Sequence, residues 1–201
     1  MPFYAPEKSQ KSKILIPADT HHAVLYAVID QGTHMISYPG EDPYPSRQCT
    51  LTWEFPEERG DFDSESKPLV LSGFYTVSTN GKAKISAVFK AADPSWQPGT
   101  RFDLSTLIGK NFMVTVIHYS NQAGDTNAKI SSVSQIPKRM PVLTPENKTL
   151  VFSLEDFLGQ YGPDEEELLE LVPKFIATGK INPIVKSLEW TKALGSDTIP
   201  F

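Results

Sequence analysis

The chain has 201 residues, 39% hydrophobic and 21% charged, with a formal net charge of −5. This composition supports one packed domain of ordinary size and excludes wholesale disorder. No run approaches the roughly 18 apolar residues of a membrane helix, and residues 1–13 lack the apolar stretch of a secretory signal. The single cysteine, Cys49, excludes an internal disulfide and a cysteine-ligated zinc site. We therefore expect a soluble, cytoplasmic protein that does not enter a membrane.

Three strands are predicted in the first half of the chain. Residues 21–30 are rich in Val, Leu, Tyr and Ile, and residues 69–78 form the third strand, with Gly73 marking a bulge. Between them, residues 48–55 alternate strictly, which indicates a half-buried strand. Its apolar face holds Cys49, Leu51, Trp53 and Phe55, and its polar face holds Gln48, Thr50, Thr52 and Glu54. The polar, proline-containing segments 40–47 and 56–68 are predicted to be loops.

The period then changes to that of a helix. Apolar residues recur from Ile85 to Ala92 at helical spacing, and Pro94 stops the pattern. A helical turn is predicted over residues 104–108. Two further strands, 112–119 and 126–133, flank a hairpin signal at residues 121–125. Five strands with one helix between the third and fourth favour a mainly β fold, a five-stranded barrel like the OB-fold, over residues 1–136.

The remainder of the chain differs in character. Residues 137–150 contain three prolines and are predicted to be a linker. Residues 151–194 form a small helical extension, with a capping box at Ser153 and Asp156 and with Pro163 at the first position of a second helix. The apolar stripe of that helix holds Leu168, Leu171, Val172 and Phe175, and Pro173 ends or kinks it. Residues 195–201 are predicted to be a flexible tip.

Charge is distributed unevenly over these parts. Residues 80–139 carry 8 basic and only 3 acidic side chains, whereas the segments before and after each have a net charge of −5. A basic segment can attract a polyanion even in an acidic protein, because the local field steers the ligand. The alternative is a solvated surface whose charges are segregated without functional meaning.

The sequence contains no recognisable catalytic or metal-binding constellation. It has no glycine-rich phosphate loop and no nucleophile elbow, and its histidines lack metal-ligand spacing. The alternating acids Asp61, Asp63 and Glu65 lack the glycine that a calcium loop requires at its sixth position. We therefore predict a non-enzymatic protein with no cofactor and no metal, although a dispersed active site leaves no local signature.

The chain ends in Asp197-Thr198-Ile199-Pro200-Phe201. This segment closely resembles the acidic tip of bacterial single-stranded DNA-binding proteins, which ends in Ile-Pro-Phe. An exposed Phe can fill an apolar pocket on a partner while its carboxylate pairs with basic groups at the rim. The resemblance implies that Asp197, Ile199, Pro200 and Phe201 bind partner enzymes. The alternative is a hydrophobic end that docks on its own domain.

The body of the chain is similar to a group of bacteriophage-encoded single-stranded DNA-binding proteins. The similarity covers residues 20–136 in short stretches, including Val28-Ile29-Asp30-Gln31-Gly32-Thr33, Leu51-Thr52-Trp53-Glu54-Phe55-Pro56, Tyr75-Thr76-Val77-Ser78 and Ala128-Lys129-Ile130-Ser131. The resemblance implies a role in phage DNA replication or recombination in the host cytoplasm, with single-stranded DNA and replication or recombination enzymes as partners. It leaves open whether the protein is a homo-oligomer.

Binding a single strand requires cations for the phosphates and aromatic faces for the bases. Trp96, in a proline-flanked loop, is the leading aromatic candidate, and Trp53 and Phe55 are assigned to the core. The predicted DNA-binding residues are Lys82, Lys84, Lys90, Trp96, Arg101, Tyr119, Lys129, Tyr75, Tyr26 and His118. Two alternatives remain: a protein-interaction or virion module in which the helical extension mediates oligomerisation, and, third, an enzyme such as a metal-dependent nuclease.

Overall fold

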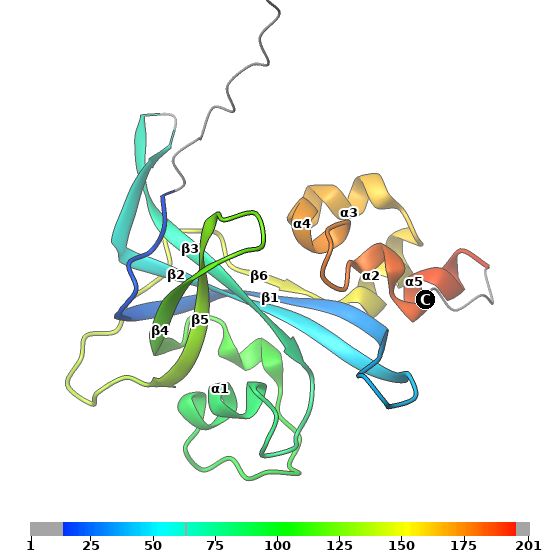
Figure 1. The fold of residues 1–201 in the computed structure, drawn as a ribbon, viewed down its shortest axis with the longest axis horizontal. Helices are drawn as coiled ribbons and strands as arrows, with labels where there is room; N and C mark the ends of the chain where they lie inside the picture. The colour runs from blue at the N-terminus through cyan, green and yellow to red at the C-terminus, as the bar shows by residue number, and fades with distance from the viewer. Residues whose placement is uncertain (1–13, 63, 196–201) are drawn as a thin grey trace, which may run out of the picture.

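The computed structural model describes residues 14–62 and 64–195, which are mainly β (Figure 1). Within these ranges no helix is long and apolar enough to cross a membrane. The strands are β1 (Thr20–Ile36), β2 (Tyr44–Phe62), β3 (Glu65–Thr76), β4 (Asn111–Ser120), β5 (Thr126–Gln135) and β6 (Leu150–Phe152). The α-helices are α1 (Ile85–Ala92), α2 (Leu154–Tyr161), α3 (Glu165–Leu171), α4 (Lys174–Ala177) and α5 (Leu188–Ala193), and 3₁₀ turns cover Leu104–Leu107 and Ile184–Lys186.

All six strands belong to one sheet in the order β3-β2-β1-β4-β5, and neighbours on this path are antiparallel. β6 pairs with β1 in parallel. On that side β1 changes its partner strand along its length. Its residues 20–24 pair with β4, and its residues 27–29 pair with β6. β3 and β5 form the two edges of the main path and share no ladder in the described strands. The sheet is therefore open, and the closed barrel that the sequence predicts is not confirmed.

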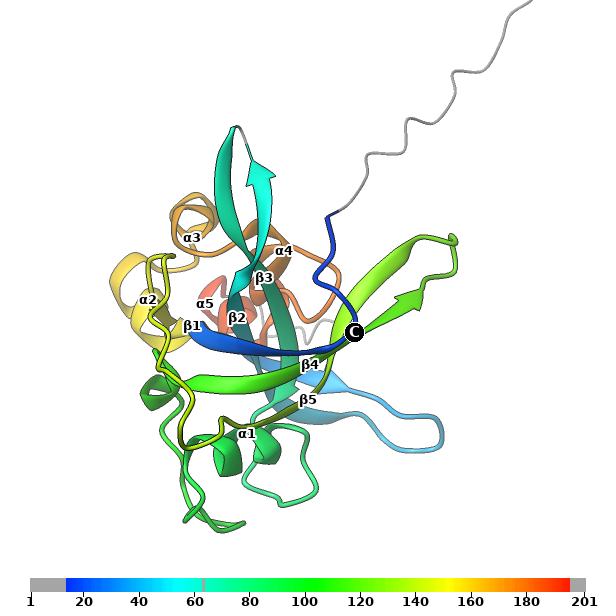
Figure 2. The same ribbon diagram turned by 90° about the vertical axis from the view of Figure 1, so that its left-hand side faces the viewer.

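Two long hairpins replace most of the predicted loops. β1 and β2 remain paired out to Ile36 and Tyr44, and β2 and β3 remain paired out to Phe62 and Glu65 (Figure 2). The loop predictions for 40–47 and 56–68 were therefore largely wrong. Proline is tolerated in the first hairpin because residues 44–47 of β2 lie before the β2–β3 ladder and, among the described strands, have β1 as their only partner. The predicted bulge at Gly73 was also wrong, since the β2–β3 ladder is irregular between Phe55 and Arg59.

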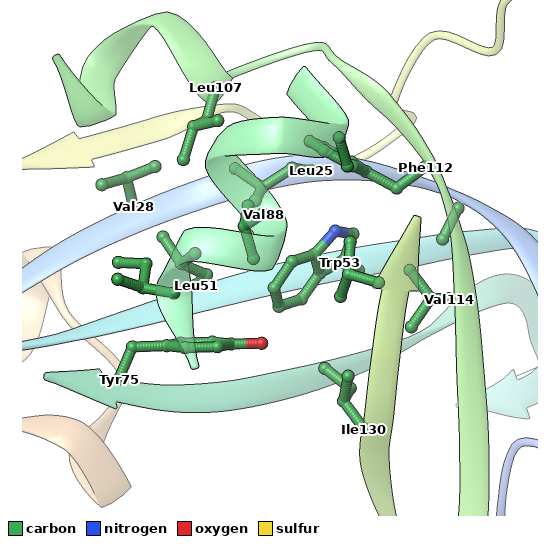
Figure 3. Close-up of a cluster of buried hydrophobic side chains, with 14 of the residues drawn as sticks. Leu25, Val28, Leu51, Trp53, Tyr75, Val88, Leu107, Phe112, Val114 and Ile130 are labelled. Carbon is green, nitrogen blue, oxygen red and sulfur yellow. The ribbon is translucent and has the colours of Figure 1, made fainter. Parts of the chain in front are cut away.

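The first core lies between the inner face of the sheet and α1 (Figure 3). Alternation along β2 places Leu51, Trp53 and Phe55 in this core, as predicted. The helical stripe of α1 places Ile85, Val88 and Phe89 against them, and these residues are also fully or almost fully buried. The strands 112–119 and 126–133, the hairpin at 121–125 and the turn at 104–108 were all predicted to within a few residues.

A second core joins the C-terminal extension, β6 through α5, to the outer face of β1. Ala27 and Ile29 of β1 belong to one buried cluster with apolar residues of every helix of the extension, including Phe157, Ile176 and Trp190. Leu25 and Val28 of the same strand point into the first core. Burial on both faces explains why β1 is an apolar run rather than an alternating one. The extension therefore packs on the sheet of its own chain.

This packing overturns the predicted polar face of residues 48–55. Gln48, Thr50, Thr52 and Glu54 are all buried. The Glu54 carboxylate accepts hydrogen bonds from the backbone N–H of Glu146 and from both the backbone and side-chain amides of Asn147, at 2.8, 2.9 and 2.6 Å. The predicted linker is thus held against the sheet, which satisfies the buried charge.

The helical extension keeps some predicted details and changes others. The Ser153 hydroxyl accepts the N–H of Asp156, which confirms a cap at the start of α2. The N-cap of α3 is Asp164, so Pro163 lies before the helix rather than at its first position. Leu168 and Val172 are buried, but Leu171 and Phe175 are exposed, so half of the predicted apolar stripe was wrong. Helix α3 ends at Leu171, before Pro173, as the sequence predicts.

Candidate nucleic-acid interface

A hollow of about 260 Å³ opens where the two edge strands of the sheet approach each other without pairing. Tyr75 of β3 forms one wall, residues 130–133 of β5 form another, and the N-terminal end of α1 with the segment before it closes the hollow. We call this site the seam hollow. Its basic lining residues are Lys82 and Lys84, and no acidic residue of the described ranges lines it.

Tyr75 is placed here by the register of β3, where it lies opposite Cys49 on the inner face of the sheet. Its ring bends back over Gly73, where an added Cβ would lie only 2.7 Å from the Tyr75 Cε2 atom. A glycine at this position therefore makes room for the ring. The side chain is almost completely buried and lies beside Trp53, at 6.1 Å between ring centroids. Burial raises the pKa of the Tyr75 hydroxyl, so it stays protonated.

Two lysine–aromatic pairs lie in this part of the structure, one at Tyr75 and one on the β4–β5 hairpin. The Lys84 Nζ atom lies 4.8 Å from the Tyr75 ring centroid, and the Lys129 Nζ atom lies 5.1 Å from that of Tyr119. Both lie within the range of cation–π attraction. Lys129 of β5 and Tyr119 of β4 are both exposed. Their strands are neighbours in the sheet, because Lys129 pairs with Ile117 and Tyr119 pairs with Asn127.

The charge of Lys129 also acts on Lys84. Partial burial lowers the pKa of Lys84, and the positive charge of Lys129 lowers it further. Within the described residues neither lysine has an ion-pair partner. Two unneutralised cations held beside aromatic rings favour an anionic ligand that also carries flat, apolar groups.

The structure thus brings together Lys82, Lys84, Lys129, Tyr75 and Tyr119 from the predicted set. Trp96, the leading aromatic candidate, is not an exposed ring. It is only 6% exposed, stacks edge-on against Phe89, and donates its indole N–H to the Thr100 carbonyl at 3.1 Å. The Pro-flanked loop folds over the end of the core, so placing Trp96 in the interface was wrong.

The remaining candidates lie elsewhere. Tyr26 is half-buried against the second core, and its pKa is raised by burial and by Glu54. The Nε2 of His118 contacts the Ile16 carbonyl at 2.8 Å, which indicates a structural role. Lys90 is exposed on α1 but does not line the seam hollow.

Arg101 lines a different and larger hollow of about 600 Å³, between the base of the β1–β2 hairpin, residues 101–105 and β6. Its charged lining residues are two arginines and two aspartates, and Arg47 is already bound by Asp30 through an Nε–Oδ1 contact of 3.1 Å. Cys49 at this hollow is buried, which raises the pKa of its thiol to about 12. Balanced charges make this hollow a weaker candidate for a polyanion than the seam hollow.

The outer face of β2 and β3 offers little to a polyanion. In OB-folds this face is a common binding surface for oligonucleotides. Here the β2 side is buried beneath residues 146–147 and the extension, and it carries the acidic Glu54. On β3, Ser72 is tied to Thr52 by a hydroxyl–hydroxyl hydrogen bond of 2.9 Å.

Sequence reasoning missed several residues of the seam hollow, notably Ala83, Ala87 and Ser132. Small side chains such as these carry no functional signal in a sequence. They shape the site only by leaving the hollow unfilled. The predicted tip residues Asp197, Ile199, Pro200 and Phe201 lie outside the described residues.

Comparison with known proteins adds no identification. No protein-family model matches the sequence, and no curated protein matches it significantly. In the part of the chain that the structure describes, no three His, Cys, Asp or Glu side chains are grouped as metal ligands.

Proposed function

We propose that this protein binds single-stranded DNA with little sequence preference and without catalysing a reaction. The proposal rests on two lysine–aromatic contacts. Lys84–Tyr75 lines the seam hollow, which has no acidic lining residue in the described ranges, and Lys129–Tyr119 lies on the adjoining β4–β5 hairpin. Cations beside aromatic rings are what non-specific binding of a single strand requires, since phosphates and base faces are common to all sequences. We take the fold to be an OB-like sheet whose last ladder is open.

In this proposal the bound strand follows the open seam between β3 and β5 rather than the covered outer face of β2. Lys82, Lys84 and Lys129 hold phosphates, and the Tyr119 ring offers a stacking surface. By its resemblance to phage single-stranded DNA-binding proteins, the protein acts in DNA replication or recombination in the host cytoplasm. The segment Asp197–Phe201 recruits partner enzymes, and deleting Ile199–Phe201 abolishes that recruitment while DNA binding persists.

The test is the fluorescence anisotropy of a labelled oligo-dT strand and of a labelled duplex, each titrated with the protein at low and moderate salt. Intrinsic tryptophan fluorescence is less suitable, because Trp53, Trp96 and Trp190 are all buried. We expect saturable binding of the single strand only, with affinity falling steeply as salt rises. Equal binding of both ligands, or of neither, contradicts the proposal.

A second candidate function is a protein-interaction or virion module. It is favoured by the apolar side chains that the extension leaves exposed on and beyond α3: Leu169, Leu171, Phe175 and Ile181. Light scattering distinguishes the two functions. Ordered assembly in the absence of nucleic acid, lost when Leu171 and Phe175 are changed to Ser, together with no binding of oligo-dT, supports the interaction module.

A further inference from the structure

The seam hollow contains a buried polar atom that the protein does not use. Tyr75 is 3% exposed, and its hydroxyl has no hydrogen-bond partner among the described residues. Figure 3 shows this oxygen directed toward the strand that carries Ile130, which also lines the hollow. An unpaired buried hydroxyl is costly to folding, and such groups are rare in native structures. A ligand that enters the hollow and pairs with this hydroxyl removes the cost.

The size of the hollow limits what can enter. At about 260 Å³ it lies below the roughly 300–1,000 Å³ of pockets that hold drug-sized ligands. Its walls are largely apolar, with Val88, Ile130 and Val133 among them. A flat, compact group of the size of one nucleobase suits this space better than a whole nucleotide.

The surroundings of Tyr75 also determine how such a group approaches it. Lys84 covers the ring at 4.8 Å from the centroid, and Gly73 lies close beneath its edge. Because the Tyr75 ring is also buried, it is not an open stacking platform, whereas the Tyr119 ring is exposed. The group left for a ligand in the hollow to pair with is the buried, unpaired hydroxyl, which both donates and accepts hydrogen bonds. It can thus pair with the edge of any base, in keeping with weak sequence preference.

We propose that one base of the bound strand inserts edge-on into the seam hollow and hydrogen-bonds the Tyr75 hydroxyl, while Lys84 and Lys129 hold the adjacent phosphates. This inference rests on the proposed binding of single-stranded DNA and specifies how the strand is held. It predicts that the protein distinguishes a strand with bases from a bare sugar-phosphate backbone at one buried position, independently of surface stacking on Tyr119.

The test compares full-length wild-type protein with Tyr75→Phe, which removes only the hydroxyl. Anisotropy titrations use an oligo-dC strand and an abasic strand of the same length and charge. We expect Tyr75→Phe to bind oligo-dC roughly 2- to 10-fold more weakly, the loss of one hydrogen bond. The affinity for the abasic strand is expected to be the same for both proteins.

A second variant blocks the hollow without touching the tyrosine or the lysines. Ala87 is an exposed residue of α1 that lines the hollow, so Ala87→Leu fills the space with a good helix former. It is expected to weaken oligo-dC binding at least as much as Tyr75→Phe. The matched control is Ala193→Leu on α5, an exposed alanine of the extension, which leaves binding unchanged.

The outcomes separate this inference from the proposed function. If wild type binds oligo-dC and both Tyr75→Phe and Ala87→Leu bind it equally well, base insertion is overturned and single-strand binding stands. If wild type binds no single strand, both proposals fail. If both variants lose the same affinity for the abasic strand as for oligo-dC, the hollow holds backbone rather than a base, and the inference is again overturned.

Discussion

The Glu189 carboxylate of α5 accepts two hydrogen bonds from Thr33 of β1, one from its backbone N–H at 2.8 Å and one from its hydroxyl at 2.7 Å. Residues 156 positions apart are thereby joined four residues after the end of the β1–β6 ladder at Ile29. Hydrogen bonds to Thr33 help to lower the pKa of Glu189 against the opposing effect of burial, so the carboxylate stays ionised. This contact holds α5 on the sheet. It also brings Glu189 close to the neighbouring Gly32, which is the subject of the first prediction.

Gly32, next to this contact, should not tolerate a side chain. It has a φ of +78°, and a Cβ added there would lie 2.6 Å from Leu154 Cδ2 and 2.7 Å from Ser187 Cβ. We expect Gly32→Ala to lower the free energy of unfolding by more than the roughly 1–3 kcal/mol of backbone strain alone. Gly40→Ala is the matched control, since Gly40 has a φ of +85° and no atom within 4 Å of the added Cβ. Equal destabilisation in chemical denaturation would contradict close packing at Gly32.

The buried carboxylate of Glu54 should be essential for holding residues 146–147. Glu54→Ala leaves the three amide donors of Glu146 and Asn147 without their acceptor. We expect a loss of roughly 3–5 kcal/mol, because several buried polar groups lose their partner together. Thermal unfolding measures the loss, and limited proteolysis tests whether residues 137–150 become accessible. Glu57→Ala, at an exposed position three residues on, is expected to change neither.

The lysines of the seam should control the salt dependence of DNA binding. For a single strand, each phosphate contact that is lost lowers the slope of log affinity against log salt by about 0.7. We therefore expect Lys84→Ala and Lys129→Ala each to weaken oligo-dT binding and to reduce this slope by that amount. Lys180→Ala, an exposed lysine of the extension, is the control for a change in net charge alone. A slope unchanged by the seam variants would place the DNA elsewhere.

DNA binding should also weaken as the solution becomes alkaline, and at a lower pH than lysines of ordinary pKa would cause. Burial and Lys129 lower the pKa of Lys84, so this side chain loses its proton below the usual lysine value of about 10.4. Bound phosphates favour the charged form, so affinity is highest below the lowered pKa and falls as pH rises through it. An oligo-dA strand avoids titration of the bases. Lys84→Arg keeps the charge and is expected to flatten the decline, whereas Lys180→Arg is not.

The sequence predicted those elements whose periodicity is local. The strand over 48–55, the helix over Ile85–Ala92 and the hairpin at 121–125 are all present. It could not predict that the polar face of β2 is covered, because the covering groups lie about 90 residues away at Glu146 and Asn147. A polar face alternating with an apolar one is the same pattern whether water or another segment of the chain satisfies it.

The candidate site was predicted in its composition but not in its arrangement. Lys84, Lys129, Tyr75 and Tyr119 were all named as DNA-binding residues, since basic and aromatic types are visible in a sequence. The Lys129–Tyr119 contact lies within the predicted β4–β5 hairpin, so a local pattern places it. The Lys84–Tyr75 contact depends on how the start of α1 packs against β3, which no local pattern encodes. Trp96 was misplaced for a related reason: proline-rich loops are usually exposed, but this one packs on Phe89.

Because both faces of β1 are buried, the parts of the protein fold in a defined order during synthesis. The helices of the extension have 4–8 residues each, too short to be stable alone, so they depend on the outer surface of β1 as a template. During synthesis Glu54 leaves the ribosome 92 residues before Glu146, which covers it, and Ile29 of β1 leaves about 120 residues before its β6 partner Phe152. The nascent sheet therefore passes through a stage in which this partly apolar outer face is exposed to solvent. A chaperone that binds exposed apolar surface would act at that stage.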